Sequence, residues 1–235
     1  MDSADRGAGT RPASEHHQPG PVGADESIRC GNTMYDNGIH AAIVHHTAGS
    51  NDYAPEDSAE IVRAIYAYHT QTLGWCDIAY NALVDKYGQV FEGRAGGITK
   101  AVEGSHTGGF NRGTWGVAMI GDFNDVPPTS IQLRTVGRLI GWRLGLDRVN
   151  PKGAATLASA GGPFTRFPGG AALTMPAVFS HRDVGPPIAP ATRHMRFLTR
   201  SGISLHISTI RQGLTTSPRR WPAVPSLPAG RRWAA

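Results

Sequence analysis

The chain has 235 residues, of which 40% are hydrophobic and 17% charged. This length and composition exclude a disordered chain and fit one domain with a sizeable core. No run of about 18 apolar residues occurs, so we expect no membrane-spanning helix. The first thirty residues contain no apolar segment of the kind found in signal peptides. Two cysteines exclude a disulfide-rich scaffold and an all-cysteine zinc module.

The net charge of +5 is unevenly distributed along the chain. Eight of the 23 basic residues are arginines in 193–235, a segment without Asp, Glu or Lys. Residues 1–192 therefore carry 15 basic and 18 acidic side chains, a net charge of −3. We interpret 193–235 as a poorly ordered basic tail and expect no nucleic-acid partner, because no aromatic-interleaved basic surface or DNA-binding motif is visible. The alternative, a nucleic-acid-binding tail, predicts strongly salt-dependent DNA binding.

In chain order, a flexible arm over residues 1–25 precedes a set of strands that alternate with helices. The apolar run before His45 and His46 predicts a buried strand. Helical periodicity predicts helices over 54–72 and 129–144, and a hairpin is expected from 78–85 and 89–92 around the turn 86–88. Two further strands are predicted at 115–123 and 177–180, separated by a Gly-, Ala- and Pro-rich surface excursion at 150–175, and a last helix near 192–200.

This alternation indicates an α/β fold: a single domain over residues 26–192 with a central mixed β-sheet flanked by helices. Histidines stand at the ends of two of its predicted strands. His45 and His46 are adjacent, so their side chains point to opposite faces and at most one of them faces a given site. His181 follows the strand 177–180. Histidine is a common zinc ligand, although a lone histidine at a strand end is more often structural.

Four segments place these histidines in a wider pattern. In order and spacing, the segments resemble the zinc-dependent N-acetylmuramoyl-L-alanine amidases of the peptidoglycan recognition protein and phage-lysozyme type. They are VHHTAG (44–49), GWCDIAYNALVDKYGQVFEGR (74–94), GSHTGGFNRGTWGVAMIGDF (104–123) and HRDVG (181–185). The resemblance spans about residues 23–185 and implies a peptidoglycan recognition protein-like fold.

The resemblance also implies roles for individual residues. It makes His45 and His181 ligands of a catalytic Zn²⁺, and it makes Tyr80 the catalytic residue that positions or polarises the substrate beside the metal-bound water. It assigns muramyl-peptide binding to His69, Trp75, His106 and Asn111. From the residues alone, Trp75 and Tyr80 could equally be core aromatics, and His106 a loop histidine that is hydrogen-bonded to backbone.

The activity implied by the family is hydrolysis of the amide between the lactyl group of N-acetylmuramic acid and L-alanine. The metal would lower the pKa of its water and polarise the carbonyl. The implied partners are peptidoglycan and muropeptides, and we expect a monomer that is secreted or associated with the cell wall. Cys30 and Cys76 either pair or remain free, and the exported setting of the family favours pairing.

The sequence departs from the family at the third zinc ligand. That ligand is a cysteine eight residues after the second histidine, within Cys-Pro-Gly, and here the position holds Ala189. Two hypotheses remain: an amidase, as the family implies, or a catalytically inactive peptidoglycan-binding module.

A shift of reading frame near residue 187 would explain this departure. The segment 187–192 is Pro-Ile-Ala-Pro-Ala-Thr, and its codons, read one nucleotide earlier, can encode Thr-Asp-Cys-Pro-Gly-Asp. The abrupt change of composition in the tail favours the same hypothesis. We therefore predict that the tail is out of frame with the ancestral gene.

Overall fold

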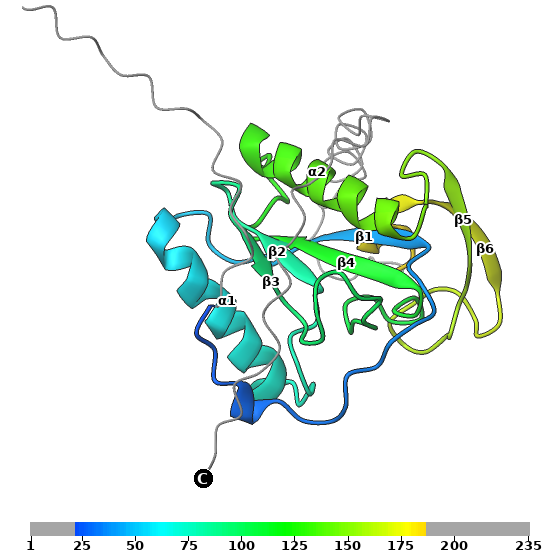
Figure 1. The fold of residues 1–235 in the computed structure, drawn as a ribbon, viewed down its shortest axis with the longest axis horizontal. Helices are drawn as coiled ribbons and strands as arrows, with labels where there is room; N and C mark the ends of the chain where they lie inside the picture. The colour runs from blue at the N-terminus through cyan, green and yellow to red at the C-terminus, as the bar shows by residue number, and fades with distance from the viewer. Residues whose placement is uncertain (1–21, 187–235) are drawn as a thin grey trace, which may run out of the picture.

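A computed structural model describes residues 22–186 of the chain (Figure 1). It confirms the predicted α/β class, with one domain built on a central mixed sheet and helices against it. Ala189, the expected helix at 192–200 and the basic tail lie outside the described residues. Val22 and Ala24, at the start of the described part, pack beside the first helix.

The central sheet has five strands in the order β3-β2-β4-β1-β7. Strands β2, β4, β1 and β7 run parallel to one another, and β3 pairs antiparallel with β2, as the predicted hairpin requires. Every residue of β2, β4 and β7 is buried, which is typical of parallel strands covered on both faces. The bounds are β1 Ala41–His46, β2 Ala82–Val84, β3 Val90–Glu92, β4 Thr114–Met119 and β7 Val178–Ser180.

Two helices lie close to their predicted positions. The first consists of a 3₁₀ turn (Pro55–Asp57), helix α1 (Ser58–Ala67) and a π-helical turn (Tyr68–Thr72). The second, α2, spans Ser130–Leu146, two residues longer than predicted at its C-terminal end. The Thr129 hydroxyl caps α2 by accepting a hydrogen bond from the Gln132 backbone N–H at 3.2 Å, which explains why the helix begins there.

The two faces of the sheet are covered differently. Helix α2 packs on one face, where Val44 of β1 points. On the other face α1 covers β2 and β4, while Ile43 of β1 packs in a separate cluster with Phe179. His45 shares the face of Ile43, because side chains alternate along a strand. It therefore lies on the face opposite α2, between two separate apolar clusters.

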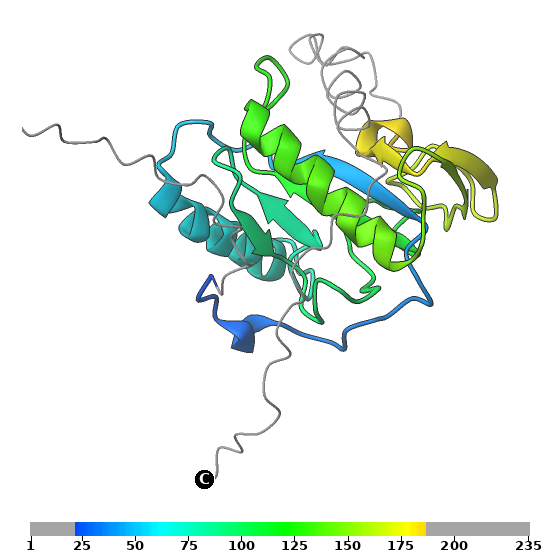
Figure 2. The same cartoon turned by 45° about the horizontal axis from the view of Figure 1, so that its top comes forward.

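Residues 150–175, predicted only as a surface excursion, contain a second sheet. Strands β5 (Ala154–Ala158) and β6 (Ala172–Pro176) form an antiparallel pair. Figures 1 and 2 place this hairpin at the opposite side of the central sheet from α1. Only Leu157 of the two strands is buried, so the small alternating side chains gave little hydrophobic signal for a strand.

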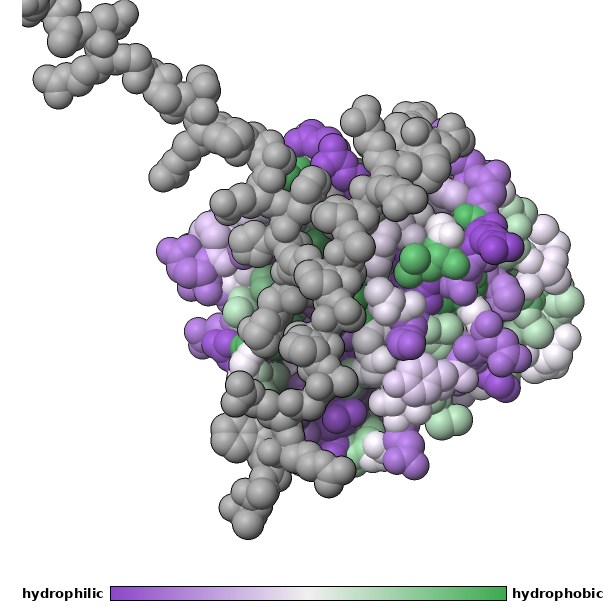
Figure 3. Space-filling model, viewed as in Figure 1, coloured by the Kyte–Doolittle hydropathy of each residue, from purple (hydrophilic) through white to green (hydrophobic). Residues whose placement is uncertain are grey.

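The surface that Figure 3 leaves visible is mixed in character, with hydrophilic residues spread over it and hydrophobic ones in small separate spots. Among residues 22–186, no helix combines the length and the apolar character needed to cross a membrane.

A disulfide joins Cys30 to Cys76, so the pairing that the family favoured is present. The two cysteines are 46 residues apart in the chain, and the backbone N–H of Cys30 also donates to the carbonyl of Cys76 at 3.0 Å. The bond joins the N-terminal segment to the turn that carries Trp75, which lies between the first helix and β2.

Replacing both cysteines with serine should destabilise the fold by up to about 4 kcal/mol. The disulfide closes a loop in the unfolded chain and lowers its entropy, and the variant regains that entropy when it unfolds. Chemical denaturation of the oxidised chain and of the double variant measures the difference. A loss below about 1 kcal/mol would show that the N-terminal segment is not constrained by this bond.

Candidate functional site

Of the two adjacent histidines, His45 packs among the other predicted site residues and is only 5% exposed. His46 points to the other face, where its Nδ1 accepts a hydrogen bond from the Phe123 backbone N–H at 3.1 Å. The predicted alternation of the two side chains is therefore present, although His46 also lines the hollow at this end of β1.

Three predicted site residues from distant parts of the chain surround the His45 ring. The ring centroid of His45 lies 5.3 Å from that of Tyr80, 5.0 Å from His106 and 5.1 Å from His181. Tyr80 precedes β2, His106 lies in the loop before β4, and His181 begins a 3₁₀ turn after β7 (His181–Asp183). The topology thus brings four predicted residues to one place on the sheet.

His106 lies against the sheet because two glycines leave room for its ring. A Cβ atom added at Gly104 would lie 2.4 Å from His106 Cδ2, and one added at Gly116 would lie 2.4 Å from both Cδ2 and Cγ. Such distances are not tolerated by real side chains. Nδ1 of His106 is 3.1 Å from Nε2 of His45 and 3.0 Å from the Thr107 hydroxyl. Nε2 of His106 is buried and has no hydrogen-bond partner among the described residues.

Burial determines the protonation of this cluster. Desolvation, assisted by the neighbouring His106, holds the pKa of His45 well below its usual value. Desolvation and the nearby His181 lower the pKa of His106 to about 3. Both imidazoles are therefore neutral at neutral pH and keep a nitrogen lone pair. Desolvation raises the pKa of Tyr80, so its hydroxyl stays protonated and can donate a hydrogen bond.

Aromatic rings continue outward from Tyr80. The ring of His69 is 5.7 Å from that of Tyr80 and 5.0 Å from that of Trp75. His69 is buried, and its Nδ1 accepts a hydrogen bond from the Ala79 backbone N–H at 3.1 Å. Trp75 is 40% exposed. His69 packs between the rings of Tyr80 and Trp75, and a contact of either His69 or Trp75 with muramyl peptide stays a prediction.

Asn111 has a structural contact within the loop that carries His106. Its side-chain oxygen accepts a hydrogen bond from the Thr107 backbone N–H at 2.7 Å. The asparagine thus closes the loop 107–111 and holds Thr107 beside His45. A direct contact of Asn111 with muramyl peptide remains a prediction.

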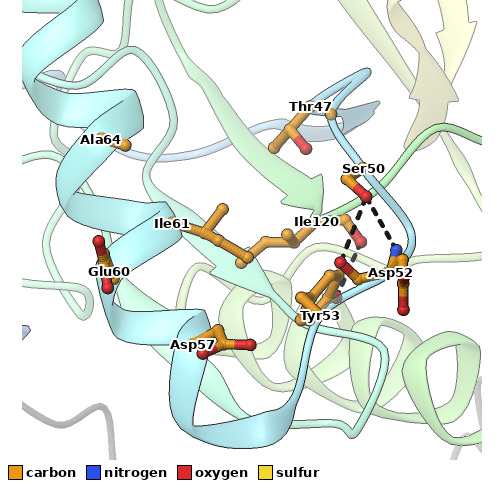
Figure 4. Close-up of a pocket in the computed structure, with 10 residues that line it drawn as sticks. Thr47, Ser50, Asp52, Tyr53, Asp57, Glu60, Ile61, Ala64 and Ile120 are labelled. Carbon is orange, nitrogen blue, oxygen red and sulfur yellow. Dashed lines mark hydrogen bonds between the residues drawn. The ribbon is translucent and has the colours of Figure 1, made fainter.

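Two hollows open beside the C-terminal end of β1. The first, of about 280 Å³, is lined by both strand-end histidines, Tyr80, His181, Arg182 and the chain at 185–186. The second, of about 370 Å³, lies between α1 and residues 47–53. Figure 4 shows Ile61 and Ile120 pointing toward one another inside the second hollow. Carboxylates line its rim, from Asp52, Asp57 and Glu60.

Sequence reasoning did not single out Thr107 or Arg182. The Thr107 hydroxyl lies 3.3 Å from Nε2 of His45, and Arg182 lines the first hollow while donating to the Asn124 side chain at 2.6 Å. Thr107 follows His106 and Arg182 follows His181 in the chain. This adjacency to a predicted site residue is the one sequence feature that could have pointed to them.

The described residues do not fit a complete zinc site. No group of three or more His, Cys, Asp or Glu side chains within residues 22–186 could hold a metal ion. His45 and His181 supply two imidazoles, and the residue at the third position, Ala189, has a methyl side chain without a donor atom. A four-coordinate catalytic zinc needs three protein ligands besides water.

Comparison with known proteins identifies the family. The model of the N-acetylmuramoyl-L-alanine amidase family matches residues 35–190, which include all seven predicted site residues. The chain belongs to the N-acetylmuramoyl-L-alanine amidase family.

Relatives of this amidase-family chain are peptidoglycan recognition proteins. Peptidoglycan recognition protein 1 of Mus musculus is 36% identical over 103 residues, covering 43% of this chain and 54% of that protein. Peptidoglycan-recognition protein SC2 of Drosophila melanogaster is 34% identical over 110 residues, covering 46% and 56%. The chain thus spans about half the length of these relatives.

Solved structures show the same fold. Human PGRP-IβC, solved in complex with glycosamyl muramyl pentapeptide, is similar with a TM-score of 0.51 and 24% identity, over 72% of this chain and 85% of that one. At this identity the likeness establishes that the amidase-family chain has the recognition-protein fold.

Gly116→Ala should destabilise this amidase-family chain by about 1–3 kcal/mol, because the added methyl group collides with the buried ring of His106. Gly145→Ala in α2 is the matched control, since no atom lies within 4 Å of its added Cβ and alanine favours helices. Chemical denaturation measures both. Equal stability of the two variants would mean that His106 does not occupy the space above Gly116.

Proposed function

We propose that this chain binds muramyl peptides of peptidoglycan on the sheet face opposite α2. The observation that carries the proposal is the convergence of His45, Tyr80 and His181 around one open hollow. The hollow offers neutral imidazoles and a protonated phenol, which can accept and donate hydrogen bonds to an amide. The human structure with the same fold holds a glycosamyl muramyl pentapeptide, which supports the same class of ligand here.

The finer proposal concerns hydrolysis. Family membership favours an N-acetylmuramoyl-L-alanine amidase, while alanine at position 189 favours a binding module without efficient catalysis. For the chain as written we propose binding with little or no cleavage, because two imidazoles alone make a weak zinc site. Amidase activity is the alternative for a chain that carries the cysteine.

We further propose that the protein works outside the cytoplasm. The Cys30–Cys76 disulfide supports this setting, because such bonds persist in oxidising compartments. Peptidoglycan is itself found there, so the proposed ligand and the proposed location agree.

Ala189→Cys should convert the chain from a weak zinc binder to one with close to one zinc per protein. The thiolate would supply the third donor beside the two imidazoles. Elemental analysis after dialysis against trace zinc measures the metal, and release of peptide from muropeptides measures cleavage. Ala189→Ser is the matched control, because its hydroxyl is a poor zinc ligand.

The proposal of a binding module is overturned if the unaltered chain purifies with stoichiometric zinc and cleaves muropeptides. Failure of the unaltered chain to bind any muropeptide overturns the proposal as a whole. Sequencing the gene across codons 180–195 tests the frame hypothesis independently, since the shifted reading must contain the Cys-Pro-Gly codons.

In the Ala189→Cys background, Tyr80→Phe should lower the rate of cleavage much more than the affinity for muropeptide. The protonated hydroxyl would donate a hydrogen bond to the oxygen that becomes negative as the amide is attacked, which acts on the transition state. Turnover and equilibrium binding are measured separately. Equal losses in both would give Tyr80 a packing role instead.

A further inference from the structure

The loop between β5 and β6 is held rigidly against both segments that carry site histidines. On one side the Thr165 hydroxyl donates to the Val184 carbonyl at 2.8 Å, and the Arg166 side chain donates to the Asp183 carbonyl, just after His181. On the other side the Ala160 backbone N–H donates to the Gly109 carbonyl at 2.8 Å, in the loop of His106. The loop 159–171 therefore has a fixed position beside the site.

Phe164 stands at the exposed part of this loop. Its residue is 68% exposed, the highest exposure among the large hydrophobic residues of the described chain. Its Cβ lies so close to Gly108 that a Cβ on that glycine would be 2.4 Å away. Gly108 is two residues from His106, so the phenylalanine sits next to the histidine loop. An exposed aromatic ring in this position offers an apolar face that a ligand can cover.

The two sides of the site differ in charge. The α1 side carries the carboxylates of Asp52, Asp57 and Glu60. The segment 149–182 contains no Asp or Glu, so the loop side offers an aromatic ring, backbone amides and the Arg166 guanidinium. A muramyl peptide is likewise two-sided: its stem peptide carries carboxylates and an amine, and its N-acetylated glycan is uncharged, since the lactyl carboxyl is joined to L-alanine as an amide.

We propose that the loop 159–171 forms the wall of the site against which the sugar rings of the glycan strand bind, with Phe164 as the contacting residue. The inference rests on the proposed function and adds the direction in which the ligand lies. The C–H face of a pyranose packs on the negative face of the aromatic ring. The stem peptide then extends toward α1 and its carboxylates.

The test compares two probes by isothermal titration calorimetry: muramyl pentapeptide with one sugar, and the same peptide on a tetrasaccharide. The unaltered chain should bind the tetrasaccharide form more tightly. Phe164→Ala should weaken that form about three- to tenfold, the size of one aromatic packing contact, and change the one-sugar form by less than about twofold. Phe164→Trp should retain the preference.

Two further variants distinguish a direct contact of Phe164 with the glycan from a general effect on folding. Leu146→Ala removes a side chain of similar exposure, 49%, from α2 on the other face and should change neither affinity. Gly108→Ala displaces Phe164 without removing its ring and should also abolish the preference for the longer glycan. Equal effects of Phe164→Ala on both probes, or none, overturn the inference while leaving the proposed function intact. If the unaltered chain binds neither probe, the proposed function itself fails.

Discussion

The contact between the His106 ring and the bare backbone at Gly116 is the constraint on which the candidate site depends. Without a side chain at that position in β4, the imidazole of His106 can lie against the sheet, with its Nδ1 3.1 Å from Nε2 of His45. Burial of the two rings, together with the other imidazoles around them, lowers both pKa values and keeps both rings neutral.

The division of the sheet into two faces explains where a ligand can bind. Helix α2 covers one face, where a continuous apolar core packs between the helix and the sheet. The other face has two smaller clusters, one under α1 and one beside the β5–β6 hairpin. Between them stand His45, Tyr80 and His181, with the hollow they line. Under the proposed function, a long ligand that crosses this gap would contact the α1 side at one end and the hairpin loop at the other.

Much of this arrangement could be predicted from the sequence, and the failures have physical causes. Buried apolar runs and a capped helix predicted the central sheet and α2, and the order of the motifs selected His45, Tyr80 and His181, whose rings lie close together in the structure. The β5–β6 hairpin was missed because its strands are rich in alanine and threonine and mostly exposed. The contact of His106 with His45 was also missed, since it depends on the absence of side chains at Gly104 and Gly116. A sequence pattern shows which side chains are present, but it does not show which distant ring fills the space beside a glycine.

The central claim is that peptidoglycan fragments bind on the face opposite α2, across the His45 cluster. A titration of the isotopically labelled chain with a disaccharide muramyl pentapeptide, followed by backbone NMR shifts, tests it most directly. The account predicts the largest shifts at Tyr80, Thr107 and residues 181–185, with smaller ones at Trp75 and in the loop 159–171, and none along the exposed side of α2. Shifts that are confined to α2, or spread evenly over the chain, would contradict it.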